Sequence, residues 1–494
     1  MSSPVPGPSA GLAPITRWLV LIVAAIGFLF DTYELLMFPV IGAQAVGQLL
    51  DVPPSSDIVR VWTGRMLWIA ALAGGAFGLL GGLLVDRLGR KTVMIGSILV
   101  YSLSPVAAAY SSELWHLVLF RCTTFIGVCV ELVAAVTWLA ELFEDKKQRE
   151  LAIGWTLACA SLGGIFVTEV FNGIVGHLRD HPDGVSWLPV PVAAWRYTLL
   201  TGLIPGAMIL VLMPFVPESR AWKERKLAGT LKRPRFAELF SPELRRATLV
   251  TTLLSACGYA AAFGALQLTP ALMTPGLPRA DIAEKRKEVA PAVKAATGKL
   301  KAAESEEEKK VARREVAKAS LPFDKAVEPV RGNIQRWQEL GGLTGRILFA
   351  ILLLYVASGV LIRIFLLPGV ILLPVTYLFL FQGEYEVFAT AIFFCGLLTI
   401  AQFSYVSEFL PRVFPVHLRG TGSAFATNVG GRMLGTMAAT LNAELLAPMF
   451  TSVEGNPLKV AYAAAIIGGT VYVIALVLSF MLPTPKDEEQ RPAA

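Results

Sequence analysis

The chain is divided by long, continuous runs of apolar residues rather than by alternating apolar and polar positions. A helix needs about 20 mostly apolar residues to cross roughly 30 Å of hydrocarbon, whereas a membrane strand would show about ten residues of alternating hydropathy. The pattern therefore predicts an all-α membrane protein with about twelve membrane-spanning helices, over residues 17–46, 61–85, 91–110, 114–140, 151–176, 195–216, 247–273, 339–360, 362–382, 386–407, 420–446 and 459–482.

Composition supports a chain that lies in a bilayer. Of its 494 residues, 54% are hydrophobic and 16% are charged, whereas a soluble domain carries about 25% charged residues. Residues 274–342 hold 26 of the charges and residues 217–246 hold 13, so the remainder has too few for a soluble surface. A soluble enzyme, a disordered chain and a nucleic-acid-binding protein are poor fits. Neither a cofactor nor a metal is expected, because the sequence contains no ATP-binding loop and its five cysteines lie in apolar runs.

Loop charge predicts the orientation, because Lys and Arg hold short loops on the cytoplasmic side. With the N-terminus inside, basic residues fall in the loops after the second, fourth and sixth helices, and the short outer loops have essentially none. The tails 1–16 and 483–494 are therefore both expected in the cytoplasm. The predicted location is the cell membrane, or the inner membrane if the cell has two.

A cytoplasmic linker, 217–246, separates two sets of six helices, 17–216 and 247–482. This arrangement suggests two related halves packed around a polar path, with substrate near the midplane. The C-terminal half is interrupted between its first two helices by residues 274–342, which are rich in Ala, Lys and Glu and are expected outside. Either this segment is a solvated insertion without chemistry, or it has a docking or lid role.

The strongest motif is G-L-L-V-D-R-L-G-R-K at residues 82–91, between the second and third predicted helices. A tight turn at Gly89 and an acid at a helix end allow the loop to latch two helices in one state and release them in another. The motif resembles the loop signature G-x-x-x-D-R-x-G-R-[KR] of the major facilitator superfamily. This resemblance implies that Gly82, Asp86, Arg87, Gly89 and Arg90 belong to a cytoplasmic gate that stabilises the outward-open state.

Further matches extend the resemblance to all of the chain except the insertion. The fourth helix carries Arg121, Gly127, Glu131 and Glu141, similar to a stretch of the proton-coupled metabolite and sugar symporters, although Phe125 and Cys129 replace two glycines. Pro217-Glu218-Ser219 resembles the P-E-S of the same families, and residues 408–422 resemble E-x-x-P-x-x-x-R-G-T-G, with Glu408 one turn early. The resemblance adds Glu141, Arg149, Glu218, Glu408 and Arg419 to the cytoplasmic gate.

The first helix carries the candidate proton site, Asp31 and Glu34, which lie three residues apart on one helical face. An acid in the middle of a span costs about 2.5–3.5 kcal/mol on insertion scales. Burial favours the neutral form of a carboxyl group, which lets it bind and release a proton near neutral pH. The stretch also resembles the D-x-[YF]-[DE] pattern of organic-acid and phosphate symporters. Alternatively, one acid pairs structurally with a base of the fourth helix. Glu131 is either a further protonation site or a fixed partner of Arg121.

Arg432 in the eleventh helix lies near the midplane, and its guanidinium fork suits a carboxylate or phosphate. It is therefore a candidate anion site, with help from Arg121, unless a buried acid neutralises it. Polar residues inside apolar helices complete the candidate substrate contacts, although most such residues make interhelical hydrogen bonds: Asn428, Tyr259, Gln267 and Gln402.

These observations predict a secondary active transporter, not an enzyme, for proton-coupled symport of a small organic anion such as a monocarboxylate. Its expected partners are the substrate, a proton and the lipid bilayer, with no nucleic acid, and the chain is expected to be a monomer. A sugar, polyol or phosphate symporter is the main alternative. A receptor or scaffold that acts through residues 274–342 is the alternative from another class.

Overall fold

A computed structural model describes residues 14–142, 146–186, 188–215, 218–228, 236–415 and 418–482. The described residues form helices and loops, without strands, which confirms the predicted all-α class. Ten helices in this part of the chain are long and apolar enough to cross a membrane. Two further crossings complete the predicted twelve: the C-terminal part of the charged helix α11, and the segment 419–449, which consists of short α and π turns.

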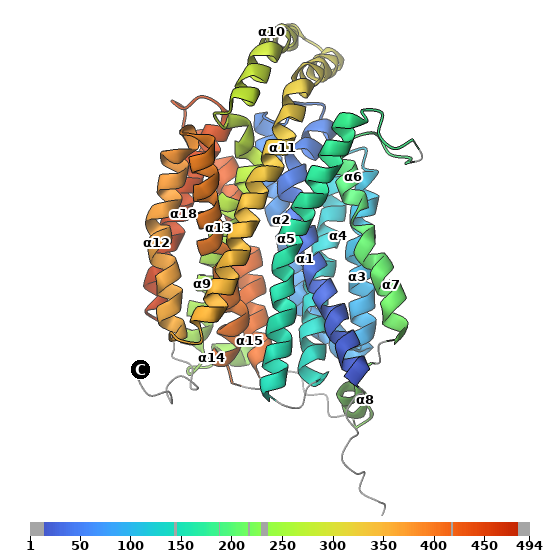
Figure 1. Cartoon of the computed structure of the whole chain (residues 1–494), viewed down its shortest axis with the longest axis vertical. Helices are drawn as coiled ribbons and strands as arrows, with labels where there is room; N and C mark the ends of the chain where they lie inside the picture. Colours follow the sequence, from blue (N-terminus) through green and yellow to red (C-terminus); the bar gives the residue numbers. More distant parts are fainter. Residues whose placement is uncertain are drawn as a thin grey trace, which may run out of the picture.

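The N-terminal half contains the first six crossings, drawn in blue to green in Figure 1. Its sixth crossing is broken into two helices around Gly202, which lies next to Glu34 and Pro105. The elements are α1 (Pro14–Leu49), α2 (Asp57–Leu88), α3 (Arg90–Ala109), α4 (Leu114–Leu142), α5 (Lys146–Asp180), α6 (Ala194–Leu200) and α7 (Leu203–Leu212). The segment between the halves contains α8 (Arg220–Leu227) and the 3-10 turn η2 (Phe236–Phe240).

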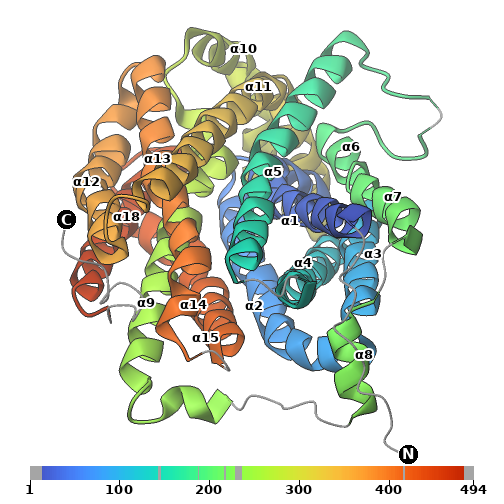
Figure 2. The same cartoon turned by 60° about the horizontal axis from the view of Figure 1, so that its bottom comes forward.

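The C-terminal half lies beside the first, as the view from below shows (Figure 2). Its first crossing, α9 (Arg245–Ala261), continues through the π turns η3 (Ala262–Leu266) and η4 (Thr269–Met273). The later elements are α10 (Ala280–Ala302), α11 (Glu306–Leu352), α12 (Ser358–Leu378), α13 (Tyr385–Glu408), α14 (Leu410–Val413), α15 (Arg419–Phe425), η8 (Ala426–Gly435), α16 (Met437–Thr440), η9 (Leu441–Leu446), α17 (Ala447–Met449) and α18 (Asn456–Ser479).

The charged segment between the seventh and eighth crossings is a helical hairpin of α10 and α11, which projects from the top of the molecule in Figure 1. Helix α11 has 47 residues, about 70 Å at 1.5 Å per residue, so one helix forms both the outer arm of the hairpin and the eighth crossing. A capping box of Ser305 and Glu308 begins it. The expected boundary at residues 339–342 is therefore absent, and the helix ends at Leu352 rather than at residue 360.

The hairpin packs against the N-terminal half. Phe323, Val327 and Val330 of α11 are buried in the same apolar cluster as residues of α1, such as Phe38 and Val46. Helix α11 has an apolar stripe on one side and a charged face on the other. Burial of the apolar stripe explains why this charged segment forms a helix. We call the end with α10 and residues 306–331 the hairpin end. The opposite end, with the α2–α3 turn, α8 and α14, is the loop end (Figure 1).

Candidate functional site

Three carboxyl groups lie buried halfway along the N-terminal half. Asp31 and Glu34 come from α1 and Glu131 from α4, with exposed fractions of 7%, 0% and 0%. Asp31 and Glu131 are electrostatic neighbours. Glu131 approaches the backbone of α1 so closely that a Cβ atom on Gly27 would lie 2.5 Å from its Oε1 atom. Both carboxylate oxygens of Glu34 lack a hydrogen-bond partner among the described residues, whereas the carboxyl groups of Glu131 and Asp31 lie close enough to interact directly.

Arg121 holds α4 against α1 through backbone hydrogen bonds, and its charge also interacts with the Glu34 carboxyl group. Its Nη1 atom donates to the carbonyl oxygen of Glu34 (2.7 Å) and its Nη2 atom to that of Leu35 (2.8 Å). The guanidinium also lies over the rings of Phe38 and Phe125, at 5.3 and 4.7 Å from their centroids. Its terminal nitrogens are therefore engaged with the backbone of α1, a role that sequence alone does not reveal.

Arg432 comes from η8 in the other half and is 5% exposed. Its Nη1 atom donates to Oδ1 of Asn428, one helical turn earlier, at 2.6 Å. Electrostatic interactions link Arg432 to Asp31 across the two halves and to Tyr259 of α9, while its Nε atom is unpartnered. The structure thus places Arg432 and its neighbour Asn428 within electrostatic reach of Asp31, which comes from the other half of the chain.

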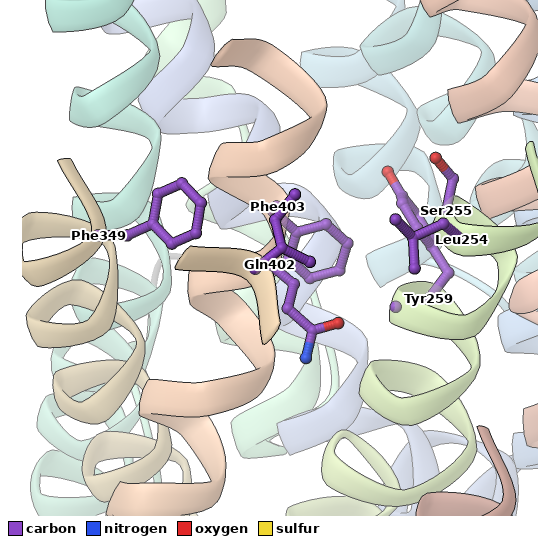
Figure 3. A pocket seen from close by; sticks show the side chains of 8 residues that line it. Leu254, Ser255, Tyr259, Phe349, Gln402 and Phe403 are labelled. Atoms are coloured by element: carbon purple, nitrogen blue, oxygen red, sulfur yellow. The ribbon is translucent and has the colours of Figure 1, made fainter. Parts of the chain in front are cut away.

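Tyr259 and Gln402 line a pocket within the C-terminal half (Figure 3). The pocket lies between α9, α11, α12 and α13. Tyr259 packs edge-on against Phe403 of α13, with ring centroids 4.9 Å apart, and Phe349 of α11 forms the opposite wall. Aromatic walls with a few polar groups suit a small apolar or aromatic ligand.

Gln267 lies away from this pocket, in a polar cluster that the sequence reasoning missed. Its Nε2 atom donates to Oε1 of Glu339 on α11, as do Gln335 and Gln338, at 3.4, 2.8 and 3.1 Å respectively. Glu339 is only 3% exposed. The Q-x-x-Q-E spacing at residues 335–339 is the sequence signal for this polar cluster. It falls in the predicted solvated insertion, because the sequence predicts that the eighth helix begins at residue 339.

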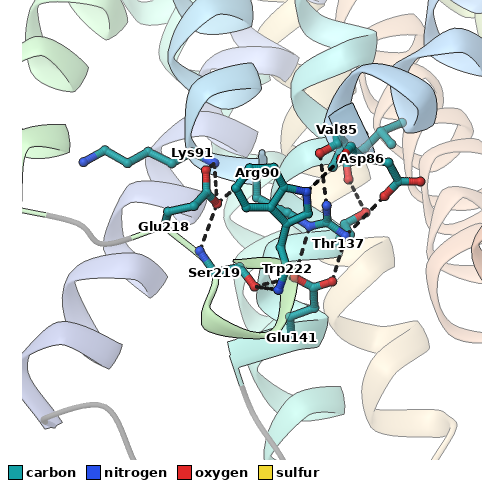
Figure 4. A network of polar contacts seen from close by, with 10 residues as sticks. Val85, Asp86, Arg90, Lys91, Thr137, Glu141, Glu218, Ser219 and Trp222 are labelled. Carbon is teal, nitrogen blue, oxygen red and sulfur yellow. Dashed lines mark hydrogen bonds and ion pairs between the residues drawn. The ribbon is translucent and has the colours of Figure 1, made fainter. Parts of the chain in front are cut away.

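At the loop end, Arg90 is the centre of a polar network (Figure 4). Its Nε and Nη2 atoms form two bonds with the carboxylate of Glu141 on α4, at 3.0 and 2.8 Å. Its guanidinium also bonds the carbonyl oxygen of Val85 and forms an ion pair with Asp86 at 3.3 Å. Because Arg90 is nearly fully buried, this bidentate pair fixes α4 against the α2–α3 turn.

Residues after the sixth crossing cap both helices of that turn. Glu218 accepts hydrogen bonds from the backbone N–H groups of Arg90 and Lys91 at the start of α3, and Trp222 donates to the carbonyl oxygen of Asp86 near the end of α2. These contacts satisfy helix-end groups that lack intrahelical partners. Gly89 has φ of +97°, and a Cβ atom there would collide with the Glu218 carboxylate, so only glycine fits this turn.

The other predicted gate residues differ in their surroundings. Gly82 has no atom within 4 Å of where a Cβ would lie, and Arg87 is exposed. Arg419 donates to the carbonyl oxygen of Phe414 (3.4 Å) within its own half. The side chains of Arg149 and Glu408 lie outside the described part of the structure.

At the hairpin end, polar side chains join the two halves. Arg65 of α2 forms two bonds with the carboxylate of Glu444 on η9, and Arg336 of α11 forms two 2.6 Å bonds with Glu169 on α5. Trp68 of α2 donates to the carbonyl oxygen of Met433 at 2.8 Å. Helix α2 of the N-terminal half is therefore bonded to the segment 419–449 of the other half, and α5 is bonded to α11.

A family model described as Major Facilitator Superfamily matches residues 21–283. The 4-hydroxybenzoate transporter PcaK of Pseudomonas putida is 32% identical over 166 residues, which cover 33% of each chain. The niacin transporter NiaP of Acinetobacter baylyi is 29% identical over 205 residues, or 41% of each chain. The arabinose-proton symporter of Bacillus subtilis is 24% identical over 217 residues, covering 42% of this chain and 43% of the relative. The matched parts span about a third to two fifths of these relatives.

Solved structures share the fold over nearly the whole chain. A crystal structure of a D-xylose-proton symporter superposes with a TM-score of 0.66 and 16% identity, covering 95% of this chain and 98% of that one. A bacterial homologue of the human lysosomal transporter Spinster, in an inward-facing state, gives a TM-score of 0.58 and 14% identity, covering 97% and 100%. At these identities the likeness concerns the fold alone.

Proposed function

Because the chain belongs to the Major Facilitator Superfamily, whose model covers residues 21–283, we propose that it is a secondary active transporter. Its cargo is a small organic anion, such as a monocarboxylate, carried together with a proton. The hairpin end faces the outside and the loop end faces the cytoplasm, as the basic loops indicate. Transport proceeds by rocking of the two halves about a central site.

The proposal rests on one observation: the buried carboxyl group of Asp31 in the first half interacts electrostatically with the buried guanidinium of Arg432 in the second. Asp31 and Glu131 are neighbours on α1 and α4, and Arg432 acts on Asp31 from η8. A proton on Asp31 removes a charge that would otherwise oppose an incoming anion and would attract Arg432. The anion then takes the guanidinium, so proton and anion bind together.

The relatives favour an organic acid as cargo. Two of the proteins described above are named for 4-hydroxybenzoate and niacin, which carry a carboxyl group on an aromatic ring. Tyr259, which lines the aromatic pocket, interacts electrostatically with Arg432. A guanidinium next to aromatic walls suits such an acid.

Replacing Asp31 with Asn tests the coupling. Purified protein is first screened for thermal stabilisation by carboxylates, sugars and phosphate at two pH values, which identifies a ligand. In proteoliposomes, Asp31→Asn should then lose accumulation driven by a pH gradient while it retains exchange of ligand at equal concentrations, because exchange needs no net proton movement. Glu113→Gln, at an exposed site, is the control. Accumulation by Asp31→Asn against a gradient would contradict the proposal.

A proton-coupled sugar symporter is the second candidate, favoured by the arabinose-proton symporter among the relatives. The variant Arg432→Gln separates the two. It should abolish uptake of an organic anion, which loses its positive partner, and it should spare uptake of a neutral sugar. If Arg432→Gln transports an anion at the wild-type rate, Arg432 is not the anion site.

A further inference from the structure

The carboxylate of Glu339 on α11 is surrounded by amide groups and lies apart from the site proposed above. Gln335, Gln338 and Glu339 lie on neighbouring turns of α11, and Gln267 reaches them from the junction of η3 and η4. All four side chains are at least 97% buried. Each amide nitrogen donates to the same carboxylate atom, Oε1 of Glu339. The carboxylate thus has only neutral donors as direct hydrogen-bond partners among the described residues.

The amide oxygens of this cluster are unsatisfied. The Oε1 atoms of Gln267, Gln335 and Gln338 are buried without a hydrogen-bond partner. Each buried acceptor left without a donor costs about 1–3 kcal/mol, so three of them around one carboxylate carry a large energetic penalty. The group is rich in acceptors, so a partner that donates hydrogen bonds would satisfy it.

The cluster lies at the seam between the two halves. The Glu339 carboxylate lies against the backbone of α5 at Gly164, where a Cβ atom would collide with it. Arg346 follows Glu339 by seven residues, two turns or about 10 Å along the same face of α11, and its Nη1 atom donates to Ser161 of α5. Electrostatic interactions connect Arg346 with both Glu339 and Tyr259. Acceptors and a cation therefore follow one another along the side of α11 that faces α5.

We propose that Glu339, with Gln267, Gln335 and Gln338, binds a hydroxyl or other hydrogen-bond-donating group of the substrate, which makes the protein selective for hydroxylated organic acids. This inference rests on the proposed function, because it assigns the substrate carboxylate to the cationic side of the path, at Arg432 and Arg346. The donor group of the same molecule then lies toward Glu339. A carboxylate at the Glu339 end would meet a like charge and unsatisfied acceptors, so the orientation is defined.

The chemistry of the cluster supports strong discrimination. A site built to bond a hydroxyl group rejects the analogue that lacks it far more effectively than an apolar pocket rejects an extra methylene group. The rejection arises because the acceptors of the site stay desolvated and unpaired when the hydroxyl is absent. Acids that differ only by one hydroxyl group therefore test the proposal directly.

The experiment measures ligand affinity by thermal stabilisation of the purified full-length protein. Two pairs are compared: benzoate with 4-hydroxybenzoate, and propionate with lactate. The wild type should bind the hydroxylated member of at least one pair more tightly by about tenfold or more. Glu339→Gln and Gln335→Leu should weaken binding of that member and leave binding of the plain acid within about twofold. Thr344→Val, at an exposed position of the same helix, should change neither.

The outcomes separate this inference from the proposed function. Equal affinity of the wild type for both members of each pair overturns the selectivity proposal, as does an equal loss for both acids in Glu339→Gln, which would indicate a structural role. Binding of a neutral sugar with no binding of any acid overturns the proposed function and, with it, the assignment of the carboxylate. If a variant unfolds, its melting temperature without ligand reveals this, and the second variant carries the test.

Discussion

At the hairpin end, side chains of the two halves bond to each other, whereas the polar network at the loop end lies within the N-terminal half and its linker. Arg65 with Glu444 and Arg336 with Glu169 join helices that are far apart in the chain. Arg90, Glu141 and Glu218 instead join α3, α4 and the segment after α7. The first network therefore connects the two halves, and the second connects elements within one half and its linker.

The hairpin strengthens this contrast, because it belongs to the C-terminal half by sequence and packs on the N-terminal half. Arg314 of α11 pairs with Asp51 at the end of α1, at 2.8 Å, and Arg331 donates to the carbonyl oxygen of Val40. In the proposed rocking, opening of the hairpin end breaks these bonds, whereas the loop-end bonds can persist through it. Similar polar contacts therefore connect the two halves at one end and elements of a single half at the other.

The largest expected effect comes from locking the hairpin end. In a background with the five native cysteines replaced by alanine, Arg65→Cys and Glu444→Cys are joined with a short cleavable thiol crosslinker. Transport should fall to near zero and return when the crosslinker is cleaved, because the two halves can no longer separate there. Before crosslinking, the double variant should retain most of its activity, since an exposed ion pair contributes about 0–1 kcal/mol.

The single-cysteine variants treated with the same reagent are the controls for that experiment. If crosslinked protein still accumulates ligand in proteoliposomes, the hairpin end does not open during transport. The contrast between the two ends would then be wrong.

The next effect concerns the polar network around Arg90 at the loop end. Gly89→Ala places a Cβ against Glu218 and forces a backbone conformation, φ of +97°, that costs other residues about 1–3 kcal/mol. Transport should fall strongly, and the melting temperature should fall as well. Gly82→Ala, in the same motif, is a matched control, because open space surrounds its Cβ position and alanine favours a helix. Equal effects of the two variants would show that the turn does not depend on Gly89.

The smallest effect is a pH dependence at the hairpin. Burial raises the pKa of Asp324 to about 6 and that of Glu328, which bonds Gln44 of α1, to about 7. The folded state then binds more protons than the unfolded state, so this stabilisation is complete below the unfolded pKa values and is lost as the pH rises through about 6–7. The melting temperature of the wild type should therefore fall over that range.

Glu328→Gln removes one of these titrations and keeps a hydrogen-bonding side chain. Its melting temperature should fall less between about pH 5 and about pH 8, by roughly 2–4 °C relative to the wild type. Glu306→Gln, at a position 81% exposed, is the control and should behave like the wild type. Parallel curves for wild type and Glu328→Gln would exclude a contribution of this carboxyl group.

Some of the site followed from sequence because its signals are local. The G-x-x-x-D-R-x-G-R-K motif predicted a tight turn and an acid beside a base, and Asp86, Gly89 and Arg90 lie together as neighbours in the chain must. The major facilitator resemblance, drawn from such motifs, is confirmed by the family match over residues 21–283. The roles of the residues remain predictions, since proximity does not establish function.

Other assignments depended on contacts that no local pattern specifies. Arg121 was a candidate substrate contact, yet its terminal nitrogens bond the α1 backbone, and a side chain's partner depends on which helix lies opposite. Glu339 was hidden because the charged outer arm of α11 lowered the apolar signal of its crossing. Because α11 is one continuous helix, its charged residues mark an exposed face and not the end of a helix.

The all-α class and the family could be predicted from the sequence, because apolar length and short motifs are properties of contiguous residues. Three features required the folded structure: the hairpin packs on the opposite half, Arg432 lies within electrostatic reach of Asp31, and three glutamines bond Glu339. The reason is physical: a buried polar group takes its partner from whatever packing brings within bonding distance, and that packing joins segments hundreds of residues apart.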